Sequence, residues 1–88
     1  MFRLWGKIFE DNHMLKDQTI EDDTQETRTH KIFNALNELC VLWDLSKPIW
    51  LEKNIAEFKK LGKTRFYQDN FIDHIDFEYL EIHIIEED

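Results

Sequence analysis

The sequence is poor in the residues that cross-link, interrupt or bend a small protein. Its 88 residues include one cysteine, one serine, one proline and two glycines. Cys40 has no second cysteine with which to form an internal disulfide, and no cysteine cluster could hold a structural zinc ion. We therefore expect a reducing, cytoplasmic environment and a fold stabilised by an apolar core.

Long apolar runs are missing as well. In the N-terminal stretch, residues 1–9, charge interrupts the apolar residues after a few positions. This stretch is too short for a signal-peptide core or a membrane span. Secretion and membrane insertion are therefore not expected.

Basic residues are outnumbered, 11 against 19 acidic ones, which gives a formal net charge of −8. This charge opposes non-specific binding to phosphate backbones and favours solubility or a basic partner. The distribution is uneven, because residues 47–65 contain six basic and two acidic residues, whereas residues 68–88 contain eight acidic residues and no Lys or Arg. The acidic tail, residues 86–88, strengthens the preference for a basic partner.

Apolar and aromatic residues are well represented, at 42% and 14% of the chain. Such a composition is typical of a folded globule and not of a disordered segment. The length suffices for one modest core. We predict a single domain spanning residues 1–88.

The first quarter of the chain predicts a β-hairpin. Apolar residues alternate over residues 2–9, with Phe2, Leu4 and Ile8 on one side of the predicted strand. Asp11 and Asn12 tolerate tight-turn geometry, so residues 10–13 predict a turn into a second strand over residues 14–20. The second strand is weakly apolar, which indicates a position at a sheet edge.

Two helices are predicted next. Asp23 and Glu26 indicate a capping box for a helix that runs to about Asp44. Pro48 suits the first turn of a second helix, and Gly62 ends it. The predicted buried positions of the two helices are Ile32, Leu36, Leu39, Trp43 and Leu51, Ile55, Phe58, Leu61. The long connector over residues 63–75 is rich in aromatic residues, so we expect it to be packed down.

The end of the chain predicts a last strand, in which Leu80, Ile82 and Ile84 anchor the helices. The fold class is therefore α+β, a two-layer sandwich of order ββααβ, with a three-stranded, mainly antiparallel sheet and two helices on one face. A helical pair that goes out and back would leave the last strand parallel to the first, whereas a connector that crosses the sheet would make it antiparallel.

Three segments resemble a group of short, uncharacterised bacterial proteins: K-P-I-W-L at residues 47–51, K-T-R-F-Y-Q-D-N-F-I at 63–72 and D-F-E-Y-L-E-I at 76–82. The similarity is clearest in the second half of the chain. It implies a bacterial, cytoplasmic protein and brings with it no activity, cofactor or binding residues.

The sheet face opposite the helices is the first candidate for function. The strand phases place Trp5 and Phe9 there, near Tyr79 and Ile85 of the last strand. Clustered aromatics on an open sheet mark a contact surface. We therefore predict a protein-interaction module that binds a protein partner or itself, for example as a dimer. A reversed strand phase, or a connector that covers this face, would remove the surface.

A basic and aromatic segment offers an alternative ligand-binding site, because cations beside stacking faces suit single-stranded nucleic acid or a phosphorylated ligand. Its residues are Lys59, Lys60, Lys63, Arg65 and Tyr67. Helix-end charges followed by a packed loop would produce the same pattern. The net charge of −8 makes nucleic acid the weaker alternative.

Metal binding and catalysis have little support. The most plausible ligands are His74 with Asp73 or Asp76, and His83, but no two of the four histidines have the spacing that places both on one helix turn. Cys40 lies on the core side of the predicted helix, as a small buried hydrophobe does. Glycine-rich phosphate loops and serine nucleophile elbows are absent. We therefore predict neither enzymatic activity nor a metal or other cofactor.

Overall fold

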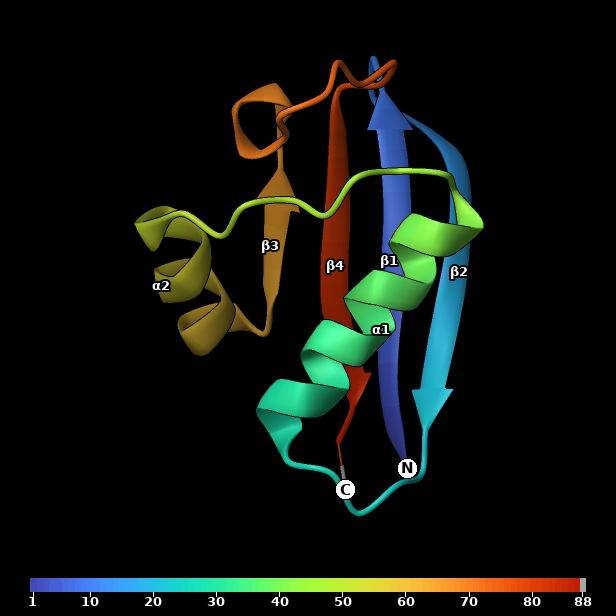
Figure 1. The fold of residues 1–88 in the computed structure, drawn as a ribbon, viewed down its shortest axis with the longest axis vertical. Helices are drawn as coiled ribbons and strands as arrows, with labels where there is room; N and C mark the ends of the chain where they lie inside the picture. The colour runs from blue at the N-terminus through green and yellow to red at the C-terminus, as the bar shows by residue number, and fades with distance from the viewer. Residues whose placement is uncertain (88) are drawn as a thin grey trace.

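The computed structural model describes residues 1–87 and shows an α+β fold built on a four-stranded antiparallel sheet. The strand order is β2-β1-β4-β3 (Figure 1). Every neighbouring pair is antiparallel, which decides the direction of the last strand. The elements are β1 (Phe2–Glu10), β2 (His13–Asp22), α1 (Arg28–Leu42), α2 (Glu52–Leu61), β3 (Lys63–Phe66), the 3₁₀ turn η1 (Gln68–Asn70) and β4 (Tyr79–Glu86).

The predicted hairpin is confirmed. Asp11 and Asn12 both have positive φ, 50° and 66°. Positive φ at both central residues is the geometry that joins twisted antiparallel strands through a two-residue turn, and Asp and Asn adopt it more readily than most residues do. β2 lies at the sheet edge, as expected.

The prediction of three strands is wrong, because the connector contains a fourth. β3 has only four residues, and Thr64 and Phe66 alone point into the core. So short an alternation cannot be distinguished from a packed loop by its sequence. The rest of the connector is packed down as expected, with Phe71 and Ile75 buried.

α1 packs across the sheet over the only glycine in β1. A Cβ atom added to Gly6 would lie 2.4 Å from Leu39 Cδ1, so this close approach of helix and strand requires glycine. The predicted capping box is wrong: Thr27 is the N-cap, and its hydroxyl accepts from the His30 amide. Glu26 instead lies 3.0 Å from the His30 ring.

α2 begins later than predicted, at Glu52, and leaves Pro48 outside the helix. Gly62 ends it in the left-handed conformation, φ 70°, as expected. Its predicted apolar side is wrong in part, since Phe58 is buried but Ile55 and Leu61 are 43% and 55% exposed.

A buried polar network, more than apolar residues, holds α2 against the rest of the fold. Asn54 is fully buried, and its amide donates to Thr64 Oγ1 and to the Arg65 carbonyl, both at 2.9 Å. The Asn70 amide donates to Asn54 Oδ1 at 2.8 Å and to the Ile49 carbonyl at 2.7 Å. These bonds join α2, β3, η1 and the preceding loop.

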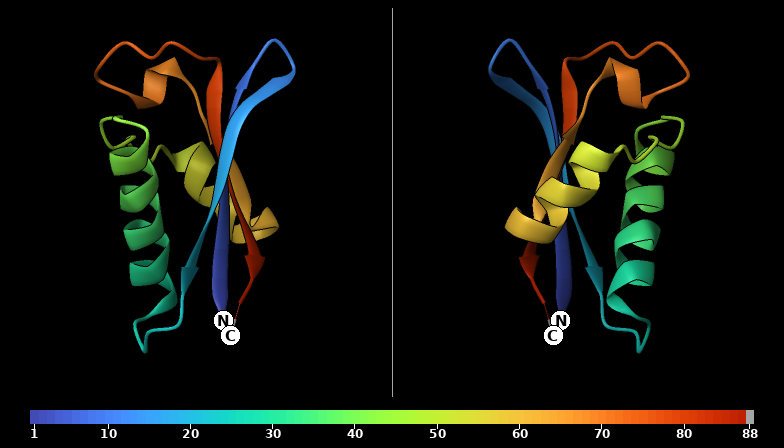
Figure 2. Two further views of the ribbon diagram at one scale, coloured as in Figure 1. Left: turned by 90° about the vertical axis from the view of Figure 1, so that its right-hand side faces the viewer. Right: turned by 90° about the vertical axis from the view of Figure 1, so that its left-hand side faces the viewer.

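The core lies between α1 and the sheet. Figure 2 shows α1 on one side of the sheet, and in Figure 1 α2 lies beside β3 at the sheet edge. Leu80 and Ile82 of β4 are fully buried, as predicted, and Ile84 packs partly buried against them. Within residues 1–87, no helix is long and apolar enough to cross a membrane.

Candidate interaction surface

The sheet face turned away from α1 is here called the open face. It carries alternate residues of each strand, and the register sets these side chains directly opposite one another. Trp5 faces His83, Lys7 faces Glu81, and Phe9 faces Tyr79. On β3, Arg65 lies opposite Glu81. No helix of residues 1–87 lies across this face in Figure 2.

Aromatic rings gather at one end of the open face. Phe9 and Tyr79 are stacked with ring centroids 5.1 Å apart, and Tyr67 lies 5.3 Å from Tyr79. Burial raises the pKa of the Tyr79 hydroxyl above its ordinary value, although the nearby Arg65 charge lowers it in part. This end of the face is therefore a layer of packed rings.

A buried carboxylate holds the centre of the open face. Glu81 is 6% exposed; one of its oxygens lies 2.7 Å from Lys7 Nζ, and the other accepts from Arg65 Nε at 2.9 Å. Burial alone would raise the pKa of Glu81, but the hydrogen bonds and charges of Lys7 and Arg65 outweigh it and leave the pKa below its ordinary value. The hydrogen bond to Glu81 is also the main reason why the pKa of Arg65 is raised.

The same two cations cover aromatic faces. Lys7 Nζ lies 3.8 Å from the centroid of the Trp5 ring, and the Arg65 guanidinium lies 4.6 Å from that of Tyr79. The Trp5 indole N–H donates to Asp17 on β2 at 2.8 Å. The open face is thus covered by its own side chains, and Lys7 and Arg65 each contact both an aromatic ring and the Glu81 carboxylate.

At the other end of β1, Arg3 Nε lies 3.3 Å from Glu21 and 3.0 Å from Glu86. Between the two ends, burial and the charges of Lys7 and Lys63 lower the pKa of His83, so this ring favours its neutral form. The open face therefore offers few uncompensated charges.

Three of the four predicted surface residues come together on this face. Trp5, Phe9 and Tyr79 lie on adjacent strands as the alternation indicated. Ile85 does not join them, because it lies at a bulge where the register slips between Arg3 and Leu4, and it is 46% exposed at the far end of the strand.

Sequence reasoning missed the ion cluster of Lys7, Glu81 and Arg65. A signal for two of its members was present, since Lys7 and Glu81 have opposite charges on strands whose phases place both on the open face. Arg65 could not be placed there without knowledge of β3.

The alternative basic segment is divided between two places. Lys63, Arg65 and Tyr67 line a hollow of about 260 Å³, together with Lys53 and two glutamates. Lys59 instead borders an apolar groove between the helices, which contains Trp50 and Phe58, and Lys60 is exposed at the end of α2. The structure therefore brings three of the five predicted residues together.

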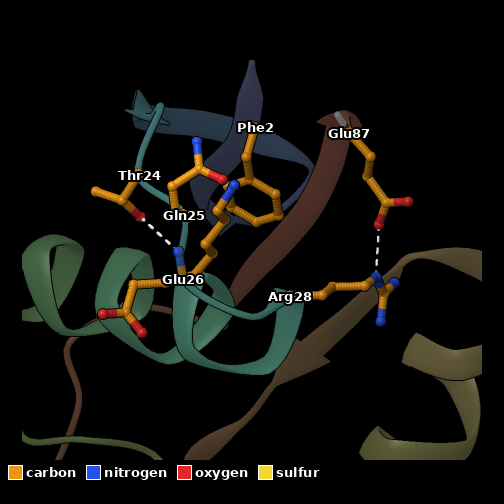
Figure 3. Close-up of a pocket in the computed structure, with 7 residues that line it drawn as sticks. Phe2, Thr24, Gln25, Glu26, Arg28 and Glu87 are labelled. Carbon is orange, nitrogen blue, oxygen red and sulfur yellow. Dashed lines mark hydrogen bonds and ion pairs between the residues drawn. The ribbon is translucent and has the colours of Figure 1, made fainter.

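Another hollow lies beside the start of α1 (Figure 3). There the Glu26 amide donates to Thr24 Oγ1 at 3.3 Å, and Arg28 Nε donates to a Glu87 oxygen at 2.6 Å. These contacts connect the loop and the end of β4 to the helix. Glu87 is the last residue of the acidic tail that the structure describes, and Asp88 lies outside the described residues.

The predicted metal ligands do not form a cluster. His74 Nε2 lies 3.4 Å from Asp76, with both side chains exposed, whereas His83 lies on β4. Among residues 1–87, no group of three or more His, Cys, Asp and Glu side chains is placed to hold a metal ion. Cys40 is buried, and burial raises the pKa of its thiol.

Comparison with protein-family models, curated proteins and solved structures gives no match to this chain. The site must therefore be interpreted from its own geometry.

Proposed function

We propose that this chain is a small binding protein that associates with another protein surface, either a second copy or a protein partner, through the open face. The observation that carries the proposal is the layer of Trp5, Phe9 and Tyr79 around the paired Glu81, with no helix laid over it. Tryptophan, tyrosine and arginine are the side chains that contribute most to protein interfaces. We propose a non-enzymatic, cytoplasmic role.

The paired charges of the open face favour a protein partner over a phosphate ligand. Glu81 already forms ion pairs with both Lys7 and Arg65, and Arg3 forms ion pairs with Glu21 and Glu86. Covering such a face leaves fewer buried charges without a partner, which is the main penalty of a polar interface. Two open faces could therefore meet although each chain carries a net charge of −8.

Sedimentation equilibrium of the wild type and Trp5→Glu tests self-association. We expect the wild type to form dimers or larger oligomers and Trp5→Glu to be monomeric, since a carboxylate would replace a central aromatic ring. Ile72→Glu is the matched control, because Ile72 is 86% exposed and lies on none of the strands that form the open face. Circular dichroism checks that both variants are folded. A monomeric wild type that Trp5→Glu leaves unchanged would contradict a homo-oligomer built on this face.

A second candidate is binding of single-stranded nucleic acid or a phosphorylated ligand. It is favoured by the hollow in which Lys53, Lys63, Arg65 and Tyr67 come together. Salt separates the two proposals. Nucleic-acid binding weakens as salt rises, because counterions are released, whereas screening of two acidic chains strengthens self-association. A gel-shift titration with mixed single-stranded DNA and RNA at low and high salt tests this candidate, and no shift at low salt would remove it.

A further inference from the structure

The outer edge of β2 presents unpaired backbone groups. The backbone N–H of Glu78, just before β4, donates to the Phe9 carbonyl of β1. Successive residues of an antiparallel strand point their backbone groups to opposite sides, so the odd-numbered residues of β1 bond toward β4 and the even-numbered ones bond toward β2. Ile20 and Gln18, which face Leu4 and Gly6, therefore bond to β1. The N–H and C=O groups of the intervening residues point away from the sheet; these residues are Asp17, Thr19 and Glu21.

One side-chain contact agrees with this assignment. The side-chain amide of Gln18 donates to the Thr19 carbonyl at 3.2 Å, as expected for a carbonyl that does not bond to β1. In Figure 1 no other element lies beyond β2, and no strand within residues 1–87 pairs with its outer side. β3, at the opposite edge, is different, because Asn54 of α2 donates to the Arg65 carbonyl there.

A groove runs beside this free edge, between β2 and α1. It has a volume of about 600 Å³, and Ile20, Val41 and Leu42 form its apolar part. Val41 and Leu42 are 82% and 56% exposed, which is high for aliphatic residues next to a core. A strand added to β2 would direct alternate side chains into this groove, because Gln18 and Ile20 line it from the α1 side of the sheet.

The polar residues that line the groove indicate a basic partner. Its remaining lining residues are Gln18, Asn34, Asn37 and Glu38, so it contains amides and one carboxylate but no cation. The backbone groups that face outward belong to two acidic residues and a threonine, and the whole chain has a net charge of −8. A basic segment is therefore attracted and an acidic one repelled.

We propose that β2 and the adjoining groove bind an extended basic peptide segment, which adds to the sheet as a fifth strand and places an apolar side chain against Val41 and Leu42. Backbone hydrogen bonds to the free edge would supply affinity, and the groove would supply specificity. This surface is distinct from the open face. Its failure would leave the proposed function untouched.

Fluorescence anisotropy with a labelled peptide of alternating valine and lysine tests the site. We expect saturable binding that Val41→Lys weakens about tenfold, because the variant removes an apolar contact and adds a repelling charge. Val41 is so exposed that its replacement should not affect folding. Ile72→Lys is the matched control, since Ile72 is 86% exposed outside the groove, and it should leave binding unchanged. Equal binding of a valine–glutamate peptide, or an equal effect of both variants, would overturn the proposal.

Amide hydrogen exchange tests the added strand directly. Without peptide, the amides of Gln18 and Ile20 should exchange slowly and those of Asp17, Thr19 and Glu21 rapidly. Saturation with the valine–lysine peptide should protect the three fast amides. Peptide binding without this protection would overturn the proposal, as would protection of all three amides before any peptide is added, because the edge would then already be paired with a second copy.

Discussion

The two faces of the sheet are built by different means from alternate residues of the same strands. On the α1 side, Leu4, Leu80 and Ile82 are fully buried aliphatic residues. On the open face, Lys7 and Glu81 are nearly as buried, at 9% and 6% exposed, yet they are charged. Burial on the first face comes from a helix, whereas on the second it comes from long side chains that lie over one another.

This difference means that the two faces contribute unequally to the stability of the fold. Aliphatic packing is favourable in proportion to the apolar area removed from water and depends on close fit. An ion pair on a sheet surface contributes less, because desolvation offsets much of its attraction. The open face therefore contributes less to the stability of the fold than its burial suggests, and its aromatic and ionic composition suits the contact with another surface that we propose.

Truncating a buried side chain on the α1 side should lower the free energy of unfolding by the largest amount. Ile82→Ala removes a fully buried side chain from the centre of β4, and we expect it to lower the free energy of unfolding by about 4 kcal/mol. Urea denaturation followed by circular dichroism measures this change. Ile85→Ala is the matched control on the same strand, and its effect should be below about 1 kcal/mol because Ile85 is half exposed. Equal effects would contradict the assignment of the strand faces.

Adding a methyl group on the α1 side should lower the free energy of unfolding somewhat less. Gly6→Ala places a methyl group 2.4 Å from Leu39 Cδ1, and we expect a loss of about 2 to 3 kcal/mol. The double-mutant cycle with Leu39→Ala tests the cause. Because the added methyl would enter the space that Leu39 vacates, the double variant should be more stable than the sum of the single effects predicts. Simple additivity would show that Leu39 is not what excludes a side chain at position 6.

Removing the Glu81 charge at the centre of the open face should lower the free energy of unfolding less again. Glu81→Gln leaves Lys7 and Arg65 without their carboxylate, and we expect a loss of about 2 kcal/mol at neutral pH. The pKa of Glu81 is lowered in the folded state, so its contribution is present above the ordinary carboxyl pKa and is lost as pH falls through the folded value.

Urea denaturation at several pH values checks this sign. The difference between wild type and Glu81→Gln should shrink on acidification, and the exposed Glu38 provides the control variant, Glu38→Gln. A difference that grows as pH falls would contradict the pairing of Glu81.

The hairpin, the phases of the first and last strands and the main core helix could be predicted from the sequence, because each has several alternating or periodic apolar residues. β3 could not, since Thr64 and Phe66 are too few to establish a period. The end of α2 at Gly62 was predicted, but its start and part of its buried side were not, because its anchor is Asn54, a polar residue whose buried hydrogen bonds reach β3. On the open face, alternation placed three aromatics correctly, but the bulge displaced Ile85, and Arg65 depended on the missing strand.

The α1 side of the sheet contains the buried aliphatic core, and we propose that the open face makes the contact with another chain. A dilution series of two-dimensional amide NMR spectra separates these two roles. We predict concentration-dependent shifts at Trp5, Phe9 and Tyr79, together with an unchanged spectrum for the residues of α1. Shifts confined to the helices or to the β2 edge would contradict this account.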